Sequence, residues 1–319
     1  MLRDLLPHLP VVLAVARRGG FAAAAKELGM SPSAVSHSVR TVEDRLGAPL
    51  FARTTRSVAL TETGRTLNDS IGAALQEIQD ALERARSERG RVAGLLRLNV
   101  PQVALSMAIT PVVTELARRH PQLVVEVSAD AALTDIVAAG FDAGVRLGEM
   151  IERDMIAVRL TPPFKAIMVA APRYLAAKGE PQGIADLARH NCIGFRLLSS
   201  GGIYAWDLLD NGEDVSVRVT GTVLVNDPTY AKELALNGVG IAYIFEPLVR
   251  KEIRDGTLCW VLPEAAIDEP GLFLYFPRRA AEAPKLRAFI EVAREVLRPE
   301  GAAGAINQSR RVIKSRSPR

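Results

Sequence analysis

The chain contains 319 residues, of which 48% are hydrophobic, and this length and composition predict two or three domains with apolar cores. The net charge of +4 is unevenly spread, because residues 1–65 and 301–319 are basic and the residues between them are acidic. This pattern favours a nucleic-acid-binding end on a neutral-to-acidic body, and the sequence holds no apolar run of about twenty residues, which excludes a transmembrane helix and a membrane partner.

The first predicted element is a helix in the apolar run at residues 9–16. This run ends in Ala14-Val15-Ala16, a pattern that signal-peptide cleavage sites share, but Asp4 precedes it in place of a positive cluster. We therefore interpret the run as the first helix of a DNA-binding domain, with Leu13 on its core face, and we expect a soluble, cytoplasmic protein.

Two helices joined by a tight turn are predicted next. Phe21–Leu28 is rich in alanine, and Gly29 ends this helix because glycine accepts a positive φ. Ser31 is a good N-cap and Pro32 is tolerated in a first turn, so a second helix begins there. Its apolar stripe of helical period consists of Val35, Val39, Val42 and Leu46. The pair is typical of a helix-turn-helix, whose second helix enters the major groove of DNA.

The front of the second helix carries small polar residues that we expect to face solvent. A major groove about 12 Å wide must accept the whole helix, so small side chains favour contact with base edges. The residues predicted to be exposed are Ser33, Ser36, His37, Ser38 and Arg40. On this pattern alone, a three-helix segment of an ordinary globular enzyme is an equal alternative.

Two short apolar runs follow within Leu50–Leu60 and flank the basic segment Arg53-Thr54-Thr55-Arg56. They predict a hairpin wing with a basic tip that contacts phosphates.

Residues 63–89 are free of proline and predict a helix roughly 40 Å long. Apolar residues recur along it in steps of three and four and form a stripe, which neighbouring apolar residues widen. The candidate seam consists of Leu67, Ile71, Leu75, Ile78 and Leu82. A heptad seam of this kind is typical of a helix that pairs with a second helix, and the alternative is a single helix packed on its own domain.

The N-terminal part of the chain resembles the winged helix-turn-helix of LysR-type transcriptional regulators. The motifs that carry the resemblance are E-x-R-L-G-x-x-L-F-x-R at Glu43–Arg53 and T-x-x-G at Thr61–Gly64. It implies a DNA-binding domain over residues 1–62 and a linker and dimerisation helix over residues 63–90. It further implies three kinds of partner: near-palindromic double-stranded promoter DNA, further copies of the chain in a homodimer or homotetramer, and RNA polymerase.

The resemblance implies a set of DNA-contacting residues: Ser31, Pro32, Ser33, Ser36, His37, Arg40, Arg53 and Arg56. The chain departs from the family at His37, where arginine is usual. Arginine grips guanine with two hydrogen bonds whereas histidine makes one, so this departure leaves the preferred bases open. For His37 a phosphate contact or simple exposure is as well supported as base reading.

Strands and helices alternate from Leu95 onward, which predicts an α/β region with a mostly parallel sheet. The predicted strands are 95–100, 123–128, 142–147, 165–170, 192–195, 221–225, 239–244 and 271–276. The predicted helices are 109–119, 134–139, short ones near Tyr174 and Ala185, 228–236 and 284–297, with a hairpin turning at Asn211-Gly212.

This region resembles the LysR-type effector domain, which has the type 2 periplasmic-binding-protein fold. The segments LRLNVP, IVAAGFDAGVRLGE and NGVGIAYIFEPLV carry the resemblance. The overall expectation is thus an α + α/β chain whose effector-binding domain spans residues 91–300. It implies subdomain I at about 91–163 and 270–300, and subdomain II at about 164–269. The basic tail, 301–319, has no apolar period and is expected to be disordered.

Ligands of α/β sheets bind at the carboxyl ends of strands, and the residues there are the candidates for binding a small-molecule effector of unknown identity. They are Gln102, Val103, Ser128, Arg146, Gly201 and Asn226. Family members often have serine or threonine after the first strand to hold a carboxylate. Pro101 and Gln102 replace that feature, so an anionic effector would depend on the charge of Arg146.

We find no pattern for catalysis, a metal or another cofactor. The four histidines are scattered, and nucleophile-elbow and P-loop motifs are missing. Cys192 and Cys259 lie in apolar runs, which favours buried thiols over a redox switch. The predicted function is that of an effector-responsive LysR-type regulator and not an enzyme. The alternatives are a solute-binding protein or an enzyme, such as a deaminase or transferase, on the same fold.

Overall fold

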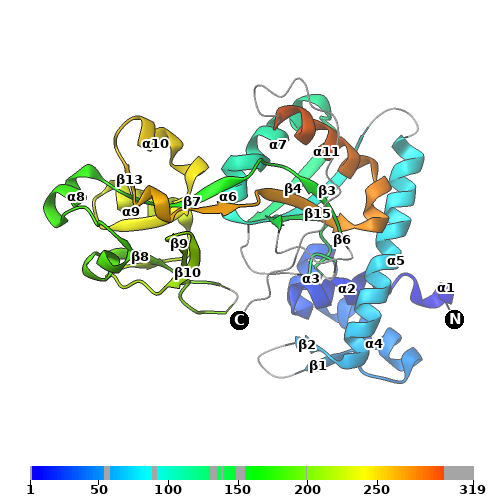
Figure 1. The fold of residues 1–319 in the computed structure, drawn as a ribbon. Coiled ribbons are helices and arrows are strands. Elements are labelled where there is room, and N and C mark those ends of the chain that lie inside the picture. Colours follow the sequence, from blue (N-terminus) through cyan, green and yellow to red (C-terminus); the bar gives the residue numbers. More distant parts are fainter. Residues whose placement is uncertain are drawn as a thin grey trace. The chain divides into compact units, whose positions relative to one another are not determined.

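The computed structural model describes residues 2–53, 58–87, 92–129, 135–137, 139–148, 155–198 and 200–297. The chain forms two compact units (Figure 1). The first lies within residues 1–90 and 134–142, and the second within residues 91–133 and 143–319.

The first unit is a helical head with a two-stranded wing, followed by a long helix. Its elements are α1 (Leu2–Leu5), α2 (Leu9–Arg18), α3 (Phe21–Leu28), α4 (Pro32–Leu46), β1 (Phe51–Arg53), β2 (Val58–Leu60) and α5 (Glu62–Ser87). Val12 and Val15 of α2, Val35 and Val39 of α4, and Leu50 before the wing are all fully buried in one core. The predicted helix over residues 9–16 is confirmed, and it is a core helix of this head.

Local sequence chemistry sets the helix ends as predicted. Gly29 ends α3 in the left-handed region at φ 63°, and Gly47 ends α4 at φ 68°. The Ser31 side chain caps α4 by accepting a hydrogen bond from the Ala34 N–H at 3.2 Å, and Pro32 occupies the first turn. The turn between α3 and α4 is therefore fixed by glycine at one end and a serine cap at the other.

The second unit contains a five-stranded sheet with strand order β4-β3-β5-β15-β6. Its strands are β3 (Gly94–Val100), β4 (Leu123–Ala129), β5 (Ala143–Leu147), β6 (Met155–Arg159) and β15 (Leu272–Pro277). Helices α7 (Thr110–Arg119) and α11 (Pro284–Val296) lie side by side against one core with this sheet (Figure 1). Between β3 and α7 the chain runs through α6 (Gln102–Ala104) and a π-helical turn, Leu105–Ile109.

A second sheet of the same unit has the order β11-β8-β12-β7-β13, with β14 also paired to β7. Its strands are β7 (Phe164–Ala170), β8 (Cys192–Phe195), β11 (Leu224–Val225), β12 (Ile241–Phe245), β13 (Cys259–Val261) and β14 (Ile267–Glu269). The helices of this part are α8 (Pro172–Lys178), α9 (Pro228–Leu236), α10 (Arg250–Arg254) and the 3₁₀ turns Ile184–Arg189, Glu246–Leu248 and Pro263–Ala265. A further 3₁₀ turn, Arg278–Glu282, follows β15 and packs with the five-stranded sheet. The hairpin of β9 (Trp206–Asp210) and β10 (Glu213–Val217) turns at Asn211 and Gly212, which both have positive φ, as predicted.

Aromatic packing joins the two sheets. Phe164 begins β7 and Phe245 ends β12, and their ring centroids lie 5.0 Å apart. Both rings pack against the core of the five-stranded sheet, although both belong to strands of the second sheet. The carboxyl end of β12 is therefore held against the other subdomain.

The structure corrects the predicted sheet direction. The pairs β3–β4, β3–β5, β8–β11 and β8–β12 are parallel, but β15 and β7 run antiparallel to every strand with which they pair. Both sheets are thus mixed. Strands β6 and β14 were not predicted. The predicted helix at 134–139 is wrong where it can be tested, because residues 135–137 and 139 are described and form a hydrogen-bonded turn, in which Ala139 N donates to Asp135 O at 3.0 Å. The tail at 301–319 falls wholly outside the described residues.

Candidate DNA-binding surface and effector site

Helix α4 presents a polar front, but Ser36 and Ser38 depart from the predicted exposure. Ser33, His37 and Arg40 are exposed, and Ser36 is half-buried. Ser38, predicted to face solvent, is instead buried with only 6% of its surface exposed. It follows Val35 by three positions, and residues three apart share a helix face, so Ser38 belongs to the core side of α4.

The start of α4 is a small hydroxyl cluster. The Ser31 and Ser33 hydroxyl oxygens lie 2.9 Å apart, and Ser31 also caps the helix. Pro32 is exposed between them. The hydroxyls are thus held by local contacts while remaining open to solvent, as a surface that meets base edges or phosphates requires.

The wing forms as predicted, with Phe51 opposite Leu60 and Arg53 opposite Val58 in an antiparallel pair. The ring of Phe51 meets the ring of Phe21 edge-on at 5.9 Å, which seats the wing against α3. The Arg53 side chain and the tip at residues 54–57, including Arg56, lie outside the described residues. Their contact with phosphate remains a prediction.

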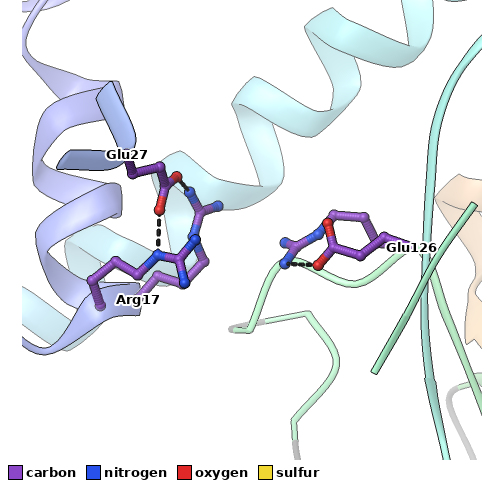
Figure 2. A network of polar contacts seen from close by, with 5 residues as sticks. Arg17, Glu27 and Glu126 are labelled. Carbon is purple, nitrogen blue, oxygen red and sulfur yellow. Dashed lines mark hydrogen bonds and ion pairs between the residues drawn. The ribbon is translucent and has the colours of Figure 1, made fainter. Parts of the chain in front are cut away.

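An ion-pair cluster that the sequence did not reveal ties α2 to α3. Figure 2 shows the carboxylate of Glu27 between two guanidinium groups, those of Arg17 and Arg18. Partial burial raises the pKa of Glu27, but the hydrogen bonds and charges of Arg18 and Arg17 outweigh this effect and hold the pKa below its usual value. Helical periodicity cannot predict such a pair, because its members are nine and ten residues apart on different helices.

The seam predicted along α5 divides into two parts. Leu67 is half-buried and packs against the core of the head. Further along, Ile71 and Leu75 are half-buried and Ile78 is 52% exposed. The Leu82 side chain lies outside the described residues. The beginning of the stripe therefore packs on the core of the head, whereas Ile78 exposes an apolar side chain to solvent.

Three of the predicted effector residues lie on or just before helices α6 and α9, which contact each other. Gln102 and Val103 belong to α6, which contacts α9, and Asn226 is the second residue before α9. Gln102 and Asn226 are exposed, and Ser128, the penultimate residue of β4, is half-buried. Helix α9 is capped by Asp227, whose Oδ1 accepts from Thr229 N at 2.7 Å. The carboxyl ends of β3 and β11 are thus brought close to each other through α6 and α9.

Arg146 has a different environment from the other candidates. Only 3% of its surface is exposed, and its guanidinium donates to Asn99 Oδ1 at 2.6 Å and to Val145 O at 2.7 Å. The charge expected to meet an anionic effector is therefore buried beside β3. Arg196 directly follows β8 and is exposed, and its guanidinium donates to Gly201 O at 2.6 Å. Gly201 is exposed and has a φ of 69°.

The described residues contain no cluster of three or more His, Cys, Asp or Glu side chains that could hold a metal ion. In the same part of the chain, no helix combines the length and apolar character needed to cross a membrane. Both cysteines are free thiols; Cys192 is buried, and its burial raises the pKa of the thiol to about 12. Glu126 of β4, labelled in Figure 2, forms an ion pair with Arg97 of β3 at 2.9 Å, which reinforces the parallel pair.

Comparison with known proteins matches both units to one family. Residues 6–65 match the bacterial regulatory helix-turn-helix protein, lysR family, and residues 89–298 match the LysR substrate binding domain. The chain is 38% identical over 301 residues to a putative transcriptional regulator of Pseudomonas aeruginosa, covering 94% of this chain and 98% of the relative.

Solved structures share the fold of this chain over most of their length. CrgA, a LysR-type transcriptional regulator from Neisseria meningitidis, aligns with a TM-score of 0.58 at 26% identity, over 91% of this chain and 98% of CrgA. The full-length regulator LysG from Corynebacterium glutamicum, solved with its effector Arg, aligns with a TM-score of 0.60 at 20% identity, over 92% and 99% of the two chains. With a family head, a family effector domain and relatives that span its length, this chain belongs to the LysR-type transcriptional regulators.

Proposed function

We propose that this LysR-type regulator reads a near-palindromic promoter site with Ser33, Ser36 and His37 of α4 while Arg53 and Arg56 of the wing hold phosphates. The observation that carries the proposal is the exposed polar front of a capped helix beside a two-stranded wing. Ser31, Pro32 and Arg40 flank that front and would contact the backbone, since most protein–DNA hydrogen bonds go to phosphate and sugar.

A mobility-shift titration on the gene's own upstream DNA tests this assignment. Arg53→Ala should weaken binding to all sequences alike and lower the slope of log affinity against log salt by about one. Ser36→Asp should abolish specific binding at moderate salt, because a carboxylate would face the DNA. Unchanged operator affinity in Ser36→Asp would show that α4 is not the recognition helix.

We further propose that the protein acts in the cytoplasm as a dimer of dimers, with α5 pairing through Ile71, Leu75, Ile78 and Leu82. The exposed Ile78 supports this seam. The edge strands β4 and β11 also carry exposed Val124 and Leu224, and unpaired strand edges favour association with another chain. RNA polymerase is the expected partner of the DNA-bound form, which a pull-down with promoter DNA present and absent would test.

The effector domain is proposed to bind a small molecule between α6 and α9, with contacts from Gln102, Val103, Ser128, Gly201 and Asn226. The support is the contact between these two helices at the carboxyl ends of β3 and β11. Arg146 remains a candidate, although a ligand would have to compete with Asn99 for its guanidinium. The proposal includes no catalytic step, and turnover of a deaminase or transferase substrate by the purified protein would contradict it.

A further inference from the structure

We propose that Glu43 is a positioning residue that sets the wing relative to the recognition helix, so that α4 and Arg53 engage the same stretch of DNA together. The inference rests on the proposed contact of the wing with phosphate. Glu43 lies in the last turn of α4 and is half-buried. Because it lies on α4 and its hydrogen-bond partners lie at the start of the wing, Glu43 links the recognition helix to the wing.

One carboxylate oxygen of Glu43 accepts two backbone hydrogen bonds at the foot of the wing. Its Oε1 lies 2.8 Å from Leu50 N and 3.3 Å from Phe51 N. Leu50 is fully buried and Phe51 is 4% exposed, so water cannot easily replace the carboxylate. A buried N–H group that loses its acceptor destabilises the arrangement that buries it. The first strand of the wing therefore starts where Glu43 holds it.

The residues that precede the first wing strand, Pro49 and Leu50, are also hydrogen-bonded to Thr61 at the start of α5. Thr61 N donates to Leu50 O at 2.9 Å, and the Thr61 hydroxyl donates to Pro49 O at 2.8 Å. The backbone of α5 passes so close that a Cβ on Gly64 would lie 2.0 Å from Leu50 O. The backbone of Leu50 is thus hydrogen-bonded to two elements: its N–H donates to Glu43 of α4, and its carbonyl oxygen accepts from Thr61, which precedes α5.

Glu43 acts on DNA through the wing, because direct contact would place a carboxylate against phosphate. Arg53 is only two residues beyond Phe51 on the same strand, so a displaced foot displaces Arg53. A merely structural role would reduce the stability of the head and weaken DNA binding without changing the number of phosphates contacted. A positioning role instead removes the contribution of the wing, and this loss appears in the salt dependence.

The test is a double-mutant cycle on the full-length protein, read by fluorescence anisotropy on the gene's upstream DNA at several salt concentrations. The variants are Glu43→Ala, Arg53→Ala and the double variant, with Glu43→Gln as the conservative control. Glu43→Ala should lower the salt slope by about one, as Arg53→Ala does, and the double variant should show no further loss. Glu43→Gln keeps an acceptor oxygen, so its slope should equal that of the wild type. The ratio of operator to mismatched-site affinity should stay within about twofold in all four proteins, because α4 itself is intact.

The outcomes separate the positioning role from the wing contact itself. An unchanged slope in Arg53→Ala would overturn the wing contact and the positioning role with it. A normal Arg53→Ala effect with an additive cycle, or a Glu43→Ala protein with an unchanged slope, would overturn the positioning role alone. If Glu43→Ala does not fold, Glu43→Asp takes its place in the cycle, because its shorter side chain keeps the charge but withdraws the acceptor from the foot of the wing.

Discussion

The polar residues of the head differ in whether they face solvent or fasten helices together. His37 is exposed on α4, and it is the candidate for direct base contact. We expect His37→Ala to reduce discrimination between operator and mismatched sites by about 1–3 kcal/mol, since that is the range for a single base contact. Arg40→Ala is the matched control: it should weaken both sites equally. Equal weakening of both sites by His37→Ala would assign His37 to the phosphate backbone.

Glu27 makes the stability of the head depend on pH, and its arginine partners decide the direction of that dependence. The pKa of Glu27 in the folded protein lies below its ordinary value of 4.5, because Arg18 and Arg17 outweigh the effect of burial. The cluster therefore adds stability above the ordinary value, and this stability is lost as the pH falls through the folded pKa. We expect Glu27→Gln to be less stable than the wild type at pH 7, and the difference to shrink at pH 3.

Urea unfolding followed by circular dichroism at the two pH values measures this change. Glu115→Gln is a positive control for the pH dependence, because Glu115 pairs with Arg118 and Arg119 within α7 and these arginines lower the pKa of its carboxyl to about 2. A Glu27→Gln protein whose deficit is equal at both pH values would show that the ion pairs contribute nothing.

These residues show how far the sequence could predict the site. Gly29, Ser31 and Asn211 act through their own backbone geometry or the adjacent turn, so local pattern was enough for them. The partners of Glu27 and Arg146 lie on other elements, and only the folded chain brings Arg146 to Asn99. Ser38 shows the limit within one helix: its polarity suggested exposure, but its spacing from Val35 placed it in the core.

At the scale of the element, the apolar stripe of α5 differs in exposure along its length. Leu67 packs on the head, whereas Ile78 is 52% exposed. We expect Ile71→Lys/Ile78→Lys to give a folded head that is monomeric, because buried unpaired charge in a helix seam costs several kcal/mol. Leu67→Lys should instead unfold the head, since its side chain enters the domain core.

Analytical ultracentrifugation, with thermal unfolding as the control for folding, distinguishes the two classes of variant. A wild-type chain that is monomeric at micromolar concentration, or a double variant that still dimerises, would remove α5 from the interface.

At the scale of the whole molecule, effector binding must favour one arrangement of the two sheets over another in order to alter DNA binding. We expect the full-length protein to be stabilised against heat by its ligand, by about 2.7 kcal/mol at a concentration one hundred times Kd. The triple variant Gln102→Ala/Ser128→Ala/Asn226→Ala should lose this stabilisation. Arg146→Ala should lower the stability of the ligand-free protein, because the buried side-chain oxygen of Asn99, Oδ1, loses its hydrogen bond from the guanidinium.

Differential scanning fluorimetry across a metabolite panel provides the measurement. A ligand whose protection survives the triple variant binds elsewhere, and the site between α6 and α9 would then be rejected.

The π-helical turn at Leu105–Ile109 has a consequence for how related chains could diverge. The Thr110 N–H donates to Leu105 O, five residues back, so this turn holds one residue more than the α-helix that follows it. An insertion absorbed in this way leaves the packing of α7 in place and rotates the short helix α6 before it by about 100° relative to α7. A lineage that lost one residue here would keep its core and yet present a different side chain in place of Gln102. If Gln102 contacts the effector as proposed, a single-codon insertion or deletion at this turn would change which molecule the regulator detects.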